Sequence, residues 1–237
     1  MQTKIDKLIA IAAKKMRHSK DPVHDLDHVE RVVEMVSRLA EDLELSKKHT
    51  QALILAAWWH DVSRTITRRP SFVYMIFIDD IISSFMLWIY TIRFGLFGSV
   101  AGMATRIILC RSFGSGKLFI RVLLRKKTRI LADILDDADN MDILRVTRIQ
   151  KMQALVESSA SYHMGYRILT WWNFSTNQLR TKTKAAEKYL LRMMREFLQW
   201  IKKLDVLAWH EQQFGKRWIK ETVYKIQKTI LSHERYA

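Results

Sequence analysis

Glycine and proline are scarce in this sequence, and their scarcity is what most limits the folds open to it. The chain of 237 residues contains only 7 Gly and 2 Pro. Sandwiches and barrels built from many short strands need frequent tight turns, which these two residues punctuate. Hydrophobic residues make up 49% of the chain, which is enough for a packed core. We therefore predict an all-α fold.

Three N-terminal segments carry apolar residues at the spacing of an amphipathic helix. The first covers residues 3–17, and the second runs from about residue 25 to residue 43. Ser46 is a candidate N-cap for a third helix, which ends near residue 61. We expect three helices in this part of the chain.

Two further helical patterns follow beyond about residue 184, and no low-complexity linker precedes them. Their apolar positions are Ala185, Tyr189, Met193, Phe197, Trp200, Ile201 and Leu204 in the first pattern, and Trp218, Ile219, Val223, Ile226 and Ile230 in the second. We predict one domain of residues 1–165 and a C-terminal helical extension of residues 166–237 that packs on it.

Residues 71–110 are apolar enough to raise the question of a membrane span. A helix needs roughly 20 consecutive apolar residues to cross a bilayer. Here Asp79, Asp80, Arg93 and Arg106 divide the stretch into shorter pieces. We predict that the segment forms buried helices of a globular domain. An apolar face that binds a membrane surface, or that joins copies of the chain into a homo-oligomer, is the alternative.

The chain is strongly basic, with a formal net charge of +16. Such a surface attracts phosphate-bearing partners, which include nucleotides, nucleic acids and anionic lipid headgroups. Cys110 is the only cysteine, so no disulfide can form within the chain, and a reducing compartment fits that count. The N-terminal segment has charges spread among its apolar positions, unlike a signal peptide. We expect a cytoplasmic protein.

Two histidines lie on apolar helix faces. His28 precedes Val32 and Val36 on one stripe, and His60 ends an apolar run. A histidine that faces a core needs partners for both ring nitrogens, and a metal ion is one way to supply them. For either residue taken alone, a core histidine bonded to a backbone carbonyl is the alternative.

An acidic run occurs later in the chain. Asp136, Asp139 and Asp142 are three residues apart, so on a helix they stand on neighbouring turns of one face. Apolar residues in the same segment make this helix amphipathic, so part of the acidic run must border the core. A buried carboxylate needs a cation, either a basic side chain or a metal ion. A solvated face explains Asp136 better than Asp139.

Taken together, three segments resemble the HD-domain superfamily of metal-dependent phosphohydrolases. They are HDLDHVERV at 24–32, WWHDVSR at 58–64 and DADNMD at 137–142. The signature of that family is a histidine, a His-Asp pair and a later aspartate. The resemblance covers roughly residues 5–150 and implies the helical bundle of an HD domain.

Carried over position by position, the resemblance implies that His28, His60, Asp61 and Asp139 hold a metal. Two imidazoles and two carboxylates suit one divalent ion, which would be Mn, Fe, Co, Ni, Zn or Mg. Many members of the family use extra histidines to hold a second metal. This chain has no histidine between residues 61 and 162, so we expect one metal.

The resemblance also implies a reaction. A bound ion lowers the pKa of a water molecule and polarises a phosphoryl oxygen, and Asp61 would orient that water. Arg64 and Arg31 are the candidate catalytic cations for an anionic substrate. We expect hydrolysis of a phosphate ester or anhydride, in a nucleotide or another small phosphorylated metabolite.

A non-catalytic module of the HD type, used for binding or sensing, is the alternative function. Residues 181–237 contain 13 Lys and Arg against 6 Asp and Glu. In such a module this basic region would contact nucleic acid, or an anionic membrane surface together with residues 71–110.

Overall fold

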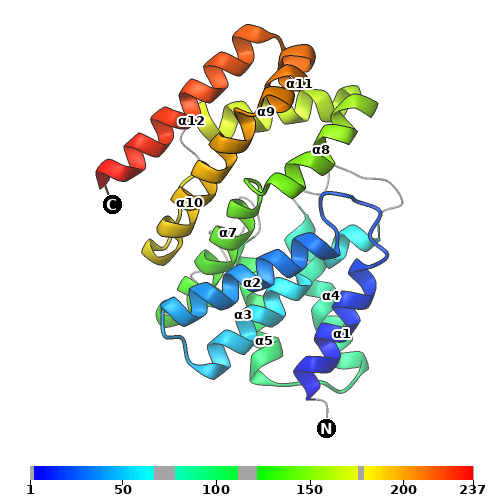
Figure 1. The fold of residues 1–237 in the computed structure, drawn as a ribbon. Helices are drawn as coiled ribbons and strands as arrows, with labels where there is room; N and C mark the ends of the chain where they lie inside the picture. Colours follow the sequence, from blue (N-terminus) through cyan, green and yellow to red (C-terminus); the bar gives the residue numbers. More distant parts are fainter. Residues whose placement is uncertain (1–2, 67–77, 112–121, 176–178, 237) are drawn as a thin grey trace. The chain divides into compact units, whose positions relative to one another are not determined.

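Helices make up all of the regular structure in the residues that the structure describes. The computed structural model describes residues 3–66, 78–111, 122–175 and 179–236. Its helices are α1 (Lys4–Met16), α2 (Leu26–Asp42), α3 (Lys47–Trp59), η1 (Val62–Thr65), α4 (Asp79–Arg93), α5 (Ser99–Arg111), η2 (Lys126–Thr128), α7 (Ile130–Asp142), α8 (Val146–Ser158), α9 (Ala160–Ser175), α10 (Lys184–Ile201), α11 (Leu204–Phe214) and α12 (Lys216–Tyr236), where η marks a short 3₁₀ helix (Figure 1). The predicted all-α fold is confirmed for these residues.

The N-terminal helices begin close to where the sequence predicts them, because their caps are local. The hydroxyl of Thr3 accepts a hydrogen bond from the backbone of Asp6, whose carboxylate accepts one from the backbone of Thr3. This reciprocal capping box starts α1. Ser46 caps α3, as predicted, by accepting from the backbone N–H of His49.

The chain divides into two compact units, an N-terminal unit of residues 1–139 and a C-terminal unit of residues 140–237. The division lies earlier in the sequence than the predicted boundary between residues 165 and 166. The physical reason is that α8 and α9 bury their apolar faces within the C-terminal unit, where α8 packs on α9 and α9 packs on α12.

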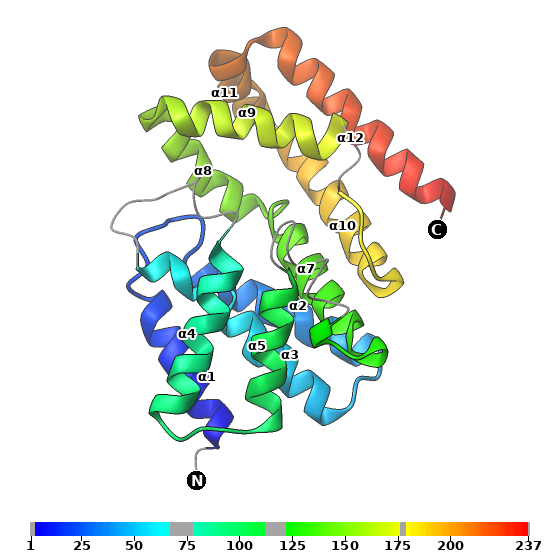
Figure 2. The same ribbon diagram turned by 180° about the vertical axis from the view of Figure 1, so that it is seen from behind.

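The core of the N-terminal unit is built around α3, which packs against α1, α2, α4 and α5. Figures 1 and 2 view the unit from opposite sides, with α2 toward the viewer in the first and α4 and α5 in the second. Leu53, Leu55 and Trp59 of α3 are fully buried. The indole N–H of Trp59 donates to the carbonyl of Leu8, at 3.1 Å, which ties α3 to α1.

The apolar stretch at 71–110 is helical over its described part. Residues 71–77 lie outside the described residues, and the rest form α4 and α5. The prediction of buried helices holds for much of α5 and for one face of α4, which buries Leu87. It is wrong for the other face of α4, where large apolar side chains are exposed. Among the described residues, no helix is both long enough and apolar enough to span a membrane.

The C-terminal unit contains a buried histidine in an aromatic core. His210 is fully buried, and its ring stacks on Trp218 with the centroids 6.1 Å apart. Its Nδ1–H donates to the carbonyl of Val206 at 2.7 Å, since a carbonyl can only accept. The other ring nitrogen is then the acceptor for the hydroxyl of Tyr166, at 2.9 Å. This arrangement requires the neutral ring.

The burial of His210 predicts a pH-dependent stability. Burial lowers the pKa of this imidazole from 6.5 to about 4. Below pH 6.5 the unfolded chain therefore binds a proton that the folded chain does not bind until pH 4. The free energy of unfolding should be constant above this window and fall as the pH drops through it, by at most about 3 kcal/mol. Thermal melting from pH 7.5 to pH 4.5 measures this loss.

The control for this prediction is His210→Phe, which cannot titrate. Its melting temperature should depend less on pH within the same window than that of the wild-type protein. Equal pH slopes for the two proteins would show that other groups account for the acid sensitivity.

Candidate metal centre

The first histidine of the candidate site lies in the first turn of α2. Asp25 is the N-cap of this helix, and its carboxylate accepts the backbone N–H of His28 at 3.0 Å. The cap fixes where the helix begins and therefore which way His28 faces. The imidazole of His28 is fully buried, on the same buried face of α2 as Val32 and Val36.

The His-Asp pair lies where α3 ends. His60 is the C-cap of α3, and Asp61 immediately precedes the short helix η1. The imidazole of His60 is fully buried, and its Nδ1–H donates to the carbonyl of Ala57 at 2.7 Å. In the neutral ring this bond leaves the lone pair on Nε2, the atom that faces the site. Such a second bond is typical of metal-binding histidines, because it orients the ring.

The structure brings together the four side chains for which the resemblance implies a metal site. His28 Nε2 lies 3.2 Å from an oxygen of Asp61 and 3.2 Å from an oxygen of Asp139. His60 Nε2 lies 3.4 Å from the same Asp61 oxygen, 3.8 Å from the same Asp139 oxygen and 3.4 Å from His28 Nε2. His28, His60 and Asp139 form a group that could hold a metal ion.

These separations are those expected of ligands that share one ion. Ligand atoms about 2.1 Å from a metal lie about 3.0 Å apart at the corners of an octahedron and about 3.4 Å apart in a tetrahedron. Carboxylate oxygens and imidazole nitrogens approach this closely only when the ring nitrogen carries a proton or when a cation lies among them. The buried oxygen of Asp61 also accepts no well-aligned hydrogen bond within the described part of the chain. The donor set therefore fits a divalent metal ion.

The charges around the site favour ionised carboxylates. Burial by itself would raise the pKa of Asp61, but the neighbouring imidazoles of His60 and His28, in their protonated form, outweigh it and hold that pKa well below its usual range. Burial would also raise the pKa of Asp139. The guanidinium of Arg111 has the larger opposing effect and the two protonated imidazoles add to it, so the pKa of that carboxyl lies well below its usual range. Both side chains can therefore act as anionic ligands.

Arg111 is a functional candidate that the sequence analysis missed. Its guanidinium donates to the second carboxylate oxygen of Asp139 at 2.8 Å and lies 3.4 Å from Asp80. Its NH1 atom is buried and has no hydrogen-bond partner among the described residues. The sequence does not indicate that an arginine at the end of an apolar helix contacts a metal ligand. Arg111 reaches Asp139 only because the end of α5 lies against α7 in the folded chain.

The structure places Arg64, a predicted catalytic cation, in a buried ion-pair network. Its guanidinium pairs with Asp79 and lies 3.6 Å from Asp21. Asp79 also accepts a hydrogen bond from the hydroxyl of Ser63 at 3.0 Å. Arg64 therefore balances two buried carboxylates. Arg31, the other predicted cation, lies half-buried on α2 one turn after His28, and its catalytic role stays a prediction.

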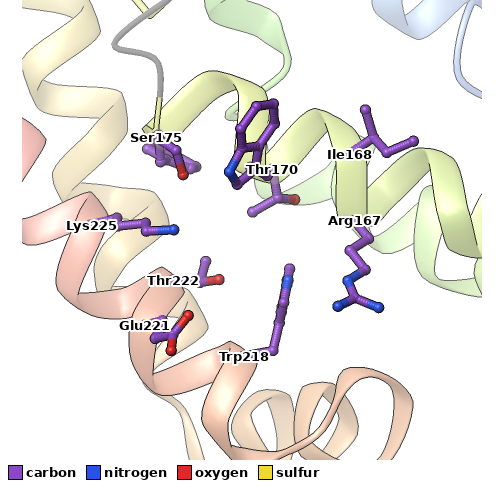
Figure 3. Close-up of a pocket in the computed structure, with 10 residues that line it drawn as sticks. Arg167, Ile168, Thr170, Ser175, Trp218, Glu221, Thr222 and Lys225 are labelled. Atoms are coloured by element: carbon purple, nitrogen blue, oxygen red, sulfur yellow. The ribbon is translucent and has the colours of Figure 1, made fainter.

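The C-terminal unit has a cleft of about 360 Å³ between α9 and α12. Its lining residues are Arg167, Ile168, Thr170, Trp171, Phe174, Ser175, Trp218, Glu221, Thr222 and Lys225. In Figure 3, Thr222 and Lys225 of α12 face Thr170 and Ser175 of α9 across this cleft. The cleft contains none of the predicted metal ligands, which all belong to the N-terminal unit.

Comparisons with known proteins identify no relative of this chain. No family model, no curated protein and no solved structure matches it. Assignment of a function therefore rests on the chain's own residues and on the geometry in which they meet.

Proposed function

We propose that this protein is a metal-dependent phosphohydrolase of the HD type. Its substrate class is a phosphate ester or anhydride, in a nucleotide or another small phosphorylated metabolite. One observation carries the proposal: two fully buried imidazoles and the carboxylate of Asp139 converge within ligand-to-ligand distance of one another. A cation held among these side chains would stabilise their buried carboxylates and imidazole lone pairs.

The proposed ligands are His28, His60, Asp139 and Asp61. Asp61 is included because its oxygen lies 3.2 and 3.4 Å from the two imidazole nitrogens. A mixed nitrogen and oxygen set accepts Mn, Fe, Co, Ni, Zn or Mg. An ion held there would lower the pKa of a water molecule and polarise a phosphoryl oxygen.

Arg111 is the proposed cation for the substrate phosphate. It touches the ligand Asp139, and its buried NH1 atom has no hydrogen-bond partner among the described residues. A guanidinium presents several donors in a fixed plane, which suits a phosphate group. Arg64 is less suited to this role, because the carboxylates that it pairs with, Asp79 and Asp21, are not proposed metal ligands.

Metal removal and reloading test this proposal. Purified protein is analysed for metals, stripped with a chelator, and then assayed against phosphomonoesters, phosphodiesters and nucleotides with each divalent metal added singly. We expect hydrolysis that chelation abolishes and one added metal restores. Asp139→Asn should lose this activity. Asp133→Asn should keep it, because Asp133 lies on the same helix but outside the metal-binding group.

Two results would contradict the proposal. Failure of the protein to bind any divalent metal would remove the basis of the site. Metal binding without hydrolysis of any phosphorylated substrate would favour the alternative of a non-catalytic sensing module.

A further inference from the structure

One face of α4 exposes an unusual number of large apolar side chains. We call these residues, together with two phenylalanines of the following turn, the α4 stripe. The α4 stripe consists of Ile78, Ile81, Phe85, Trp88, Ile89, Ile92, Phe94 and Phe97. Phe85 is 55%, Trp88 51% and Phe97 61% exposed. Scattered exposed apolar residues are ordinary, whereas a contiguous exposed patch marks a surface that binds something.

The spacing of these residues makes the patch continuous. Successive stripe residues on α4 are three, four or one residue apart, and this spacing keeps them on one side of the helix. The opposite side of α4 is buried within the N-terminal unit through Ser83, Leu87 and Thr91. The α4 stripe is therefore not the core-facing side of the helix. Figure 2 shows α4 and α5 on the side of the N-terminal unit opposite α2.

The turn after α4 extends the patch beyond the helix end. Leu96 is buried and anchors this turn, while Phe94 and Phe97 on either side of it are exposed. Gly95 adopts φ +60°, a left-handed conformation that ends helices and favours glycine. The backbone N–H of Leu96 donates to the carbonyl of Thr91, which closes the helix end. Two aromatic rings are thus held outward by an ordered turn.

Two positive charges lie beside the C-terminal end of the α4 stripe. The guanidinium of Arg93 lies 5.7 Å from the ring centre of Phe94. The ammonium of Lys4 donates to the carbonyl of Gly95, in the turn after α4, at 3.3 Å. No acidic residue occurs from residue 81 to residue 111.

The two carboxylates at the start of α4 add no exposed negative charge to this surface. Asp79 and Asp80 are buried, and each lies against a guanidinium, that of the buried Arg64 for the first and that of Arg111 for the second. The charged groups that contact the stripe and its turn, Arg93 and Lys4, are therefore both positive.

Exposed apolar rings with neighbouring cations favour some binding partners of the α4 stripe over others. A second copy of the chain joined by a two-fold axis would bring identical cations together around the apolar contact, which opposes pairing. A nucleic acid would place its phosphates against apolar rings. An anionic bilayer surface complements both features, since its acyl region accepts the rings and its headgroups accept the cations.

We propose that the α4 stripe docks the protein on anionic lipid bilayers, with Phe85, Trp88 and Phe97 buried at the headgroup boundary. Lys4 and Arg93 contact the lipid phosphates and carboxylates. Trp and Phe are suited to this depth, and adjacent lysines and arginines strengthen binding to anionic lipid. The inference is independent of the proposed hydrolase activity.

Flotation with lipid vesicles tests the proposal on the full-length protein. The vesicles consist of phosphatidylcholine alone or of phosphatidylcholine mixed with phosphatidylserine. The wild-type protein should float with the mixed vesicles and much less with the neutral ones. Trp88→Glu and Phe97→Glu should each abolish flotation. Arg93→Gln combined with Lys4→Gln should weaken binding about 30-fold, at roughly five- to sixfold for each cation.

Leu204→Glu is the matched control, because Leu204 is 86% exposed but lies on α11 in the C-terminal unit. This variant should float like the wild-type protein. All substituted stripe residues are exposed, so the variants should melt at the wild-type temperature. Quenching of Trp88 fluorescence by brominated lipid, measured as the difference between the wild-type protein and Trp88→Phe, reports the docking directly.

Three outcomes would overturn the proposal. The wild-type protein could stay unbound to mixed vesicles, or Phe97→Glu could float unchanged. Light scattering could also show a dimer that Trp88→Glu converts to a monomer, which would identify a second copy of the chain as the occupant.

Discussion

Replacing His60 with alanine is expected to abolish divalent-metal binding and, with it, the proposed hydrolysis. The substitution removes a buried imidazole whose Nε2 lies 3.4 Å from His28 Nε2 and 3.4 Å from an oxygen of Asp61. Loss of an outer-shell partner alone costs about 10–100-fold in metal affinity, so loss of a ligand should cost more than about 100-fold. Competition with a chromophoric chelator measures the change.

The metal should also stabilise the wild-type protein, because an ion that binds only the folded state shifts the folding equilibrium. We expect the melting temperature to rise with added metal in the wild-type protein and to stay constant in His60→Ala. This comparison separates lost metal binding from any loss of packing in the variant. His18→Ala is the matched control, since His18 is exposed. Unchanged metal affinity in His60→Ala would exclude this cluster as the metal site.

Replacing Arg64 with methionine should cause the largest loss of stability, about 3–5 kcal/mol in the free energy of unfolding. The substitution leaves the carboxylates of Asp79 and Asp21 buried without their cation. Burial raises the pKa of Asp79 to about 7 even though Arg64 opposes the shift. The variant should therefore lose less stability at pH 5, where Asp79 binds a proton, than at pH 8. Urea denaturation at the two pH values measures both effects.

A surface pair provides the control for this experiment. Arg38 pairs with Glu34 on the exposed side of α2, with both side chains about half exposed. Arg38→Met should change the free energy of unfolding by less than about 0.5 kcal/mol. Combining Arg64→Met with Asp79→Leu should restore part of the lost stability, because the unpaired carboxylate is removed as well. If Arg64→Met were stable but bound metal without catalysis, the sequence prediction of a catalytic Arg64 would be supported instead.

Local signals explain which helices could be predicted. The residues predicted at 25–43 form α2 at Leu26–Asp42, and those predicted from Ser46 form α3 at Lys47–Trp59. Apolar periodicity and caps such as Asp25 act within one or two turns, so they can be read from the chain alone. The helix α11, which carries the buried His210, was not predicted, because nothing local distinguishes it.

The apolar stretch at 71–110 shows that apolar periodicity alone does not predict which side of a helix is buried. Along α4, Leu87 is fully buried and its neighbour Trp88 is half exposed, although both are large apolar residues. A helix that is apolar on every side carries no pattern that indicates its buried face. Only the packing of α4 against α5 and the rest of the N-terminal unit decides which side remains exposed.

The sequence by itself determined the helical class, which follows from residue type and from spacing within a few turns, and the expected metal ligands were supplied by its resemblance to the HD family. Only the tertiary structure decided that His28, His60 and Asp139 meet, that Arg111 lies against Asp139 and that Arg64 pairs with Asp79. The physical reason is that these side chains belong to helices distant in the chain and meet only when the helices pack. Residue spacing along the chain does not specify which helices pack together.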